Sequence, residues 1–212
     1  KGVNCRNEPD ENMPVDKHGN RADVIVYGAS TFGRSNYGRF YAQFFNATRR
    51  DLVHRLRKEA GFVDFNRKFT LEELSVLDKN PEFVRYAWQE LLEFYSIIVP
   101  LQYEGLKNDP DPLSRVKLTL QSEGFLYSPP DNPVNNYDVA SKISYSRFCP
   151  LYDKVELTDI VGIRRESEVP VLIGEMPFIF LEKTGEDCSA VASAKTHSLG
   201  VIAKLNNFDR NT

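Results

Sequence analysis

Cysteine is scarce in this sequence, and no two cysteines are spaced as a metal-binding pair. The three residues are widely separated along the chain: Cys5, Cys149 and Cys188. Structural zinc sites usually draw on C-x-x-C pairs, so the spacing argues against a zinc site within this chain. Isolated cysteines in odd number instead predict free thiols, buried or half-buried, in a reducing cytoplasm.

Long apolar runs and a surplus of positive charge are also missing. No run approaches the roughly 18 apolar residues that suggest a membrane span, and no signal peptide opens the chain, so we expect no membrane partner. The net charge of −3 gives no general attraction to nucleic acid, so such a contact must come from a local face or from partner chains. Hydrophobic residues form 41% of the 212 residues, which suffices for one or two domains with a core.

Helix patterns are strongest in the first half of the chain. Apolar residues recur at three- and four-residue steps over residues 36–60, and Gly61 supplies a stop. Residues 70–73 form a capping box before a short helix, and Asn-Pro at 80–81 starts a further helix that ends at Pro100. Five basic residues lie within the first helix, and we expect them to form a solvated face, with a nucleic-acid contact as the alternative. They are Arg49, Arg50, Arg55, Arg57 and Lys58.

Strand patterns are shorter than the helix patterns. Short apolar or alternating runs predict strands at residues 22–27, 115–120, 155–163 and 170–181. The last of these is expected to be buried and bent at Gly174 and Pro177. Residues 107–140 otherwise carry loop signals, and Asp109-x-Asp111, which lies between prolines, predicts a plain turn.

One stretch, residues 12–41, combines a turn, an apolar run and a Gly- and Ser-rich crossing that leads into the first helix. By residue types alone it is a strand-turn-helix joint of any α/β domain. Its letters, however, follow the pattern Met-Pro-x-Asp-x-x-Gly-x-x-x-Asp-Val and then Arg-x-Asn-x-Gly. The matching residues are Met13, Pro14, Asp16, Gly19, Asp23, Val24, Arg34, Asn36 and Gly38. Their order and spacing resemble the C-terminal part of the β subunit of multisubunit DNA-dependent RNA polymerases.

Three further pieces follow the same family pattern. Residues 1–3 are similar to the end of its Gly-Asn-Lys-Gly-Val motif, residues 151–153 to its Leu-Tyr-Asp, and residues 170–176 to its Pro-Val-x-Val-Gly-x-Met run. Residues 42–146 match only as a helical insertion followed by loops. Because the chain starts inside the first of these motifs, we expect it to be a piece of a longer polypeptide.

The resemblance implies an α+β fold, with parts of a double-psi β-barrel and a helical insertion. It divides the chain into four segments. These are the active-site side of the barrel at 1–41, the helical insertion at 42–106, a loop-rich connector at 107–146, and returning strands with an RNA-side loop at 147–212.

The resemblance also implies site residues. Arg34 matches the arginine that reaches the triphosphate of the incoming nucleotide, a task that suits a permanently charged guanidinium donating in a fork. The alternative for Arg34 is an ordinary surface arginine in a loop. Lys1 matches the lysine beside the RNA 3′ end or the initiating nucleotide. Lys195, Lys204 and Arg210 align loosely with a loop that meets the RNA or DNA backbone.

No residue of this chain is expected to be catalytic or to bind metal. The aspartate cluster that holds Mg²⁺ in polymerases is absent from the sequence, and in the family it lies on the β′ subunit. The resemblance therefore implies a DNA-directed RNA polymerase in which this chain is inactive alone. Its partners would be β′-like and other β-like subunits, the DNA template, the RNA transcript and NTPs.

The sequence departs from the cellular enzymes of this family at two places. Residues 27–30 read Tyr-Gly-Ala-Ser where those enzymes have Asn-Pro-Leu-Gly, and residues 190–193 stand in place of His-Ala-Arg-Ser. Such divergence resembles the split RNA polymerases of giant bacteriophages, which implies the cytoplasm of an infected bacterial cell, or the virion, as the location. The alternative from another class is a non-catalytic nucleic-acid-binding or virion assembly module that retains a polymerase-like scaffold.

Overall fold

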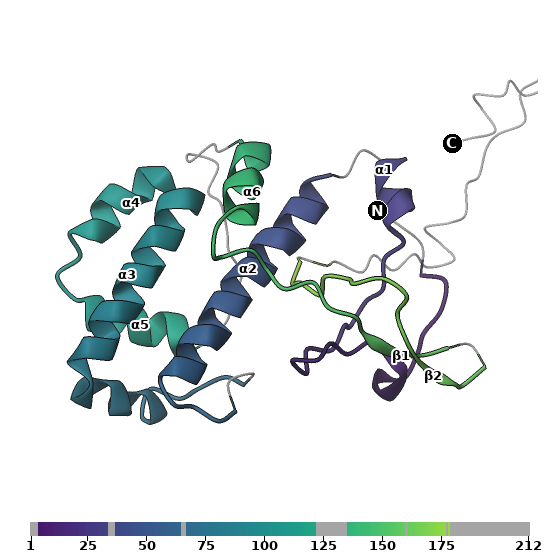
Figure 1. The fold of residues 1–212 in the computed structure, drawn as a ribbon, viewed down its shortest axis with the longest axis horizontal. Helices are drawn as coiled ribbons and strands as arrows, with labels where there is room; N and C mark the ends of the chain where they lie inside the picture. Colours follow the sequence, from purple (N-terminus) through teal and green to yellow (C-terminus); the bar gives the residue numbers. More distant parts are fainter. Residues whose placement is uncertain are drawn as a thin grey trace, which may run out of the picture. The chain divides into compact units, whose positions relative to one another are not determined.

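The computed structural model describes residues 4–33, 37–64, 67–121, 135–159, 161–176 and 178 (Figure 1). The chain divides into two units, residues 1–176 and 177–212, and the helices and strands below all belong to the first unit. Its elements, with η for a 3-10 helix, are η1 (Asp10–Asn12), α1 (Gly28–Phe32), α2 (Gly38–Glu59), η2 (Glu73–Lys79), α3 (Pro81–Ile98), α4 (Pro100–Lys107), α5 (Pro112–Gln121), α6 (Asn136–Ser144), β1 (Glu156–Thr158) and β2 (Arg164–Glu166). The described residues are therefore mixed α+β, mostly helical with one two-stranded sheet, and they do not show a double-psi barrel.

The longest helix, α2, confirms the helix predicted over residues 36–60. It ends in a Schellman motif, in which Gly61 takes a φ of +89°. The Phe62 N–H donates to the Arg57 carbonyl at 3.1 Å, and the Gly61 N–H donates to the Lys58 carbonyl at 3.0 Å. Gly61 is thus the stop that the sequence predicted.

The basic residues of α2 do not form the expected solvated face. Lys58 is exposed, but Arg50 and Arg57 are buried. Arg57 donates from Nε to the Leu120 carbonyl at 2.9 Å, and its guanidinium lies 4.9 Å from the centre of the Phe69 ring. Because other segments cover α2, two of its guanidinium groups turn inward, where they must find acceptors to offset the cost of burial.

Helix α3 follows its predicted bounds. The Asn80 Oδ1 accepts the Phe83 N–H at 3.1 Å, which caps the helix, and Pro81 is its first residue. Pro100 ends α3 as predicted and also begins α4. The buried apolar side chains of α3 are Val84, Ala87, Trp88, Leu91, Phe94 and Ile98.

One apolar core joins α2, η2, α3, α5 and α6 (Figure 1). Its fully buried members include Leu56, Leu74, Leu91, Phe94, Val116, Leu120 and Ile143. Each such side chain stabilises the fold by roughly 1.5–3 kcal/mol relative to an exposed one.

The capping box at residues 70–73 is confirmed, since the Thr70 N–H donates to Glu73 Oε2 at 2.8 Å and the Glu73 N–H to Thr70 Oγ1 at 3.3 Å.

The strand predicted at residues 115–120 is wrong, because this stretch forms α5. Asp111 caps the helix by accepting the Ser114 N–H at 3.1 Å. The buried residues of this stretch, Val116, Thr119 and Leu120, follow helical spacing. A strand would bury Leu118 together with Val116 and Leu120, but Leu118 is exposed. The expected turn at Asp109 is confirmed, since the Asp111 N–H donates to Asp109 Oδ1 at 2.9 Å.

A buried carboxylate, Glu90, links α2, α3 and the segment after α6 through ion pairs. Glu90 on α3 accepts from Arg55 on α2 at 2.6 Å and from Arg147, beyond α6, at 2.8 Å. Phe148 lies beneath both guanidinium groups, which are 5.8 and 5.3 Å from its ring centre. This cluster fixes where the chain leaves the helices for the strands.

The strand predicted over residues 155–163 is confirmed only for residues 156–158. The strand β1 is followed by a turn and then by β2, antiparallel to it, with Glu156 opposite Glu166. The turn forms because Asp159 Oδ1 accepts the N–H groups of Val161 and Ile163, both at 2.9 Å, and Gly162 takes a φ of +86°.

Two other strand predictions are wrong within the described residues. Residues 22–27 form no strand, and four of their apolar side chains, from Val24 to Tyr27, are exposed. Residues 170–176 are not a buried strand, since they are partly exposed and form one β-bridge, between Val171 and Asp153. The bend expected at Pro177 lies outside the described residues. A strand needs a neighbour to satisfy its backbone, and sequence composition does not supply one.

Two of the three cysteines lie at the surface. Cys5 and Cys149 are exposed, which corrects the expectation of buried or half-buried thiols, and Cys188 lies outside the described residues. None of the described helices has both the length and the apolar character to cross a membrane.

Candidate functional site

The motif Met-Pro-x-Asp-x-x-Gly forms a tight turn. Asp16 organises it, because its Oδ1 accepts the His18 and Asn20 N–H groups at 2.9 and 2.8 Å, and its Oδ2 accepts from Asn20 Nδ2 at 2.7 Å. Gly19 takes a φ of +82°, a conformation that favours glycine. Val15 and Arg21 then face each other across a β-bridge. The motif residues Asp16 and Gly19 therefore have a structural role in this chain.

The turn at residues 13–19 is bonded to the region of the later motif pieces, residues 151–153 and 170–176. Val15 exchanges backbone hydrogen bonds with Glu156, both at 2.9 Å. Lys17 Nζ lies 2.9 Å from Asp153 Oδ1, and Asp153 in turn exchanges backbone bonds with Val171 at 3.2 and 2.9 Å. The hydrogen bond between Lys17 and Asp153 raises the pKa of the lysine and lowers the pKa of the aspartate. The turn at residues 13–19 thus meets the two later motif pieces, 151–153 and 170–176, around Asp153.

The run at residues 170–176 is held by a polar face of α2. Gln43 Nε2 donates to the Leu172 carbonyl at 2.8 Å, and Asn46 Nδ2 donates to the Glu175 carbonyl at 2.9 Å. Arg50 Nη1 donates to the Ile173 carbonyl at 2.7 Å. The three donors are three and four residues apart and so share one side of the helix. We call Gln43, Asn46 and Arg50 the α2 clamp.

Arg50 is the charged member of the clamp, and two carboxylates neutralise its charge. Its guanidinium bonds Asp51 Oδ1 at 3.0 Å and reaches Glu175 Oε1 at 3.4 Å. Burial opposes the charge, but the two carboxylates outweigh it and raise the pKa of Arg50. Asp51 Oδ2 accepts the Leu151 N–H at 2.9 Å, so the same pair holds both ends of the returning segment.

The two glycines of the stretch around Arg34 that the structure describes, Gly33 and Gly38, have open space where a side chain would begin. A Cβ atom on Gly38 would meet no heavy atom within 4 Å, and one on Gly33 would meet nothing nearer than the Ser30 carbonyl at 4.0 Å. Neither glycine has a positive φ. The first turn of α2 contains no acidic residue, and its N-cap residue, Tyr37, makes no side-chain capping bond. No carboxylate of the first turn therefore offsets the positive end of the α2 dipole.

All the site residues implied by the resemblance lie outside the described residues. They are Lys1, Arg34, Lys195, Lys204 and Arg210. Within the described ranges, no group of three or more His, Cys, Asp and Glu side chains is arranged to hold a metal ion. On either side of Arg34 in the sequence, the structure describes α1, which ends at Phe32, and α2, which begins at Gly38.

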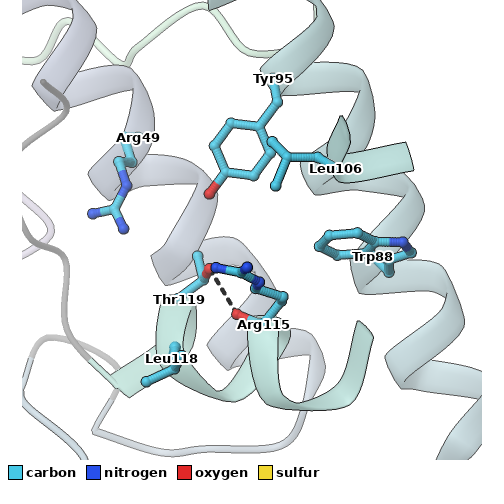
Figure 2. A pocket seen from close by; sticks show the side chains of 7 residues that line it. All are labelled: Arg49, Trp88, Tyr95, Leu106, Arg115, Leu118 and Thr119. Carbon is cyan, nitrogen blue, oxygen red and sulfur yellow. Dashed lines mark hydrogen bonds between the residues drawn. The ribbon is translucent and has the colours of Figure 1, made fainter. Parts of the chain in front are cut away.

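A separate hollow of about 190 Å³ lies among the helices (Figure 2). The side chains around it are Arg49, Trp88, Tyr95, Leu106, Arg115, Leu118 and Thr119, and the Tyr95 hydroxyl points into it. Two arginines would suit an anion, but Arg115 is held by Asp109, with 2.8 Å between Nε and Oδ2. We therefore place the candidate site at the meeting of the motif segments instead.

Sequence reasoning missed the α2 clamp and the Lys17–Asp153 pair. The signal for the clamp was present, since an amide, an amide and a guanidinium recur at helical spacing on α2. Their acceptors are backbone carbonyls, however, which every residue carries. A scan against protein-family models found no family that matches this chain, and a search of curated proteins found no match.

Proposed function

We propose that this chain is a segment of a β-like subunit of a DNA-dependent RNA polymerase. In this proposal it supplies contacts to the nucleotide triphosphate and to the RNA hybrid during template-directed transcription. The catalytic Mg²⁺ belongs to a β′-like partner chain, and other β-like chains complete the complex with DNA and RNA. The enzyme works in the infected bacterial cell or from the virion.

One observation carries the proposal. The motif pieces at residues 13–24, 151–153 and 170–176 were matched only by letters and order, yet they meet through the Lys17–Asp153 pair and the Asp153–Val171 bridge. A chance resemblance in separate loops gives no reason for such a meeting. The helical insertion between them folds as a separate apolar core, as an insertion would. We propose that residues 22–27 and 170–176 join a double-psi barrel with strands of partner chains.

The surroundings of Arg34 support its assignment to the triphosphate. None of the described residues crowds positions 33 and 38, and glycines there leave room for a ligand. The first turn of α2 begins four residues beyond Arg34, with Gly38, and contains no acidic residue, so the positive end of this helix favours an anion. Together these features favour a phosphate contact over a surface arginine without function.

A second candidate rests on the exposed apolar residues at 24–27. Such a surface also suits an assembly module of a virion that no longer transcribes. The two candidates differ in what Arg34 does. In the polymerase Arg34 must affect nucleotide use, and in the assembly module it need not.

The test is single-nucleotide addition by the assembled polymerase on a preformed scaffold, across a nucleotide titration. Arg34→Ala should leave assembly intact and cost roughly 1.5–3 kcal/mol, about ten- to a hundredfold in catalytic efficiency, because one charge-assisted phosphate contact is lost. Arg34→Lys should recover only part of this, since an ammonium lacks the fork. Arg85→Ala, which removes an exposed arginine from α3, is the matched control. Unchanged nucleotide dependence in Arg34→Ala would show that the assignment is wrong.

A further inference from the structure

The hollow shown in Figure 2 lies where four of the described helices meet. Trp88 and Tyr95 are seven residues apart on α3, so they share one side of that helix. Arg115 and Thr119 are four residues apart on α5, about one turn. The helices α2 and α4 each add one side chain to the wall. Sites for small ligands often form between packed helices in this way.

One side of the hollow is apolar. Trp88, Leu106 and Leu118 line it, and only 8% of Trp88 is exposed. An aromatic ring and two leucines offer contact to a flat apolar group. The volume of about 190 Å³ is smaller than the roughly 300–1,000 Å³ of pockets that hold drug-sized molecules. The hollow therefore suits a single ring system.

The other side of the hollow offers hydrogen-bond donors that the described residues do not use. The Tyr95 hydroxyl points into the hollow and bonds none of the described residues (Figure 2). Asp109 takes only the Nε of Arg115, so neither Nη atom of Arg115 has a hydrogen bond among the described residues. Thr119 donates its hydroxyl to the Arg115 carbonyl at 2.9 Å. Donors of this kind match a ligand that carries several acceptor oxygens.

The charge around the hollow is positive but low. Its described lining includes two arginines, Arg49 and Arg115, and no acidic side chain. Arg115 lies at the rim, where 56% of its side chain is exposed. A guanidinium group binds phosphate through paired N–H donors. Because Asp109 offsets one of the two charges, a bare anion gains little here, and a ligand must also use the apolar side.

We propose that this hollow binds one unpaired nucleotide, with its base against Trp88 and Leu106 and its phosphate at Arg115 and the Tyr95 hydroxyl. Every base has a flat face that packs on aromatic and apolar side chains, and phosphate oxygens accept from guanidinium groups. The nucleotide is either free or the 5′ end of a single strand, which carries the same phosphate. The inference goes beyond the proposed function, since it uses none of the residues assigned to the triphosphate and does not depend on that assignment.

Trp88 makes binding at this site directly measurable. It is the only tryptophan among the 212 residues, so tryptophan fluorescence reports on the hollow. The full 212-residue chain is titrated with adenosine monophosphate (AMP), adenosine and inorganic phosphate. We expect AMP to quench the fluorescence and to bind about tenfold more tightly than either of its parts, because each part reaches only one side of the hollow. Tighter binding of the 5′-phosphorylated dinucleotide pApA than of AMP assigns the site to a strand end, and weaker binding assigns it to the free nucleotide.

Single substitutions separate the two sides of the hollow. Arg115→Met should weaken AMP binding about tenfold and leave adenosine binding unchanged, since one charge-assisted contact is lost. Tyr95→Phe should weaken AMP binding roughly threefold and keep the packing of the ring. Arg85→Met, which removes an exposed arginine of α3 outside the hollow, is the matched control and should change neither affinity. Circular dichroism verifies that each variant is folded.

Three outcomes overturn the inference. If AMP does not quench Trp88 in the folded chain, no nucleotide enters the hollow. If AMP binds no more tightly than adenosine, or keeps its affinity in Arg115→Met, the phosphate contact is wrong. If Arg85→Met weakens AMP binding as much as Arg115→Met does, the attraction is a general effect of surface charge and the hollow is not a nucleotide site.

Discussion

The helical part of the molecule and the strand-containing part are stabilised in different ways. Apolar side chains from α2, η2, α3, α5 and α6 fill one core in the helical part. In the strand-containing part, residues 13–27 and 151–176, only Pro14 and Val155 are buried among the residues described. That part is held by backbone bridges, by the Lys17–Asp153 pair and by the α2 clamp.

This difference has a consequence for independence. A packed apolar core is self-sufficient, because it removes its own surface from water. Hydrogen bonds and ion pairs contribute less net free energy each, and many of those in the strand-containing part end on α2. The apolar residues at 24–27 stay exposed. The strand-containing part therefore depends on α2 for its position and has little core of its own.

The largest effect is expected from a cavity in the helical core. Phe94→Ala should lower the free energy of unfolding by about 3–5 kcal/mol, because Phe94 is about 1% exposed and packs against Phe148. Leu101→Ala on the neighbouring α4 should change it by no more than roughly 0.5 kcal/mol, since Leu101 is 67% exposed. Urea unfolding of both variants measures the difference. Equal losses would mean that the helical part lacks a specific core.

A medium effect is expected where the two parts meet. Gly174→Ala should cost about 1–3 kcal/mol, because the added methyl group clashes with the Gln43 carbonyl. Its hydrogen-exchange signature should be confined to residues 171–175. Gly105→Ala should instead stabilise the protein by roughly 0.5–1 kcal/mol, since Gly105 lies in α4 with open space around it. A stabilising Gly174→Ala would show that the contact with α2 is loose.

The two parts also differ in how well the sequence predicts them. The helices α2 and α3 contain many turns, so their apolar period and their end signals, Gly61 and Asn80, reinforce each other. The six residues 115–120 satisfy both an alternating and a helical pattern. The capping bond of Asp111 and the exposure of Leu118 show that this stretch is the helix α5 and not a strand. The strand prediction took neither feature into account.

In the strand-containing part, the sequence does not show which segment each predicted strand would pair with. Residues 22–27 have the composition of a strand, but among the described residues only Ala22 bonds a neighbouring segment, through the Pro14 carbonyl, and no strand pairs with the run. Arg50 was expected in solvent, because a sequence does not show which carbonyls a helix face will meet. The motif letters located the turn of Asp16 and Gly19, and the roles of Arg34 and Lys1 stay predictions.

The smallest effect concerns a surface interaction of the helical part, the capping box of η2. Glu73 accepts two bonds from Arg67, at 2.6 and 3.1 Å, and one from the Thr70 N–H. The Arg67 hydrogen bond, followed by that of Thr70, lowers the pKa of Glu73 from 4.5 to about 2. A carboxylate with a depressed pKa contributes stability that is complete above its unfolded pKa and is lost as the pH falls toward its folded pKa.

The stability difference between the unsubstituted protein and Glu73→Gln should therefore be constant above about pH 5 and shrink progressively toward about pH 2. Glu72→Gln is the matched control, because the side chain of this neighbouring exposed carboxylate forms no hydrogen bond with any of the described residues. Thermal unfolding across this pH range, at low and high salt, measures the effect. High salt should reduce it, since Glu73 and Arg67 both face solvent. A difference that grows on acidification would mean that Glu73 has a raised pKa and that the capping box does not form in solution.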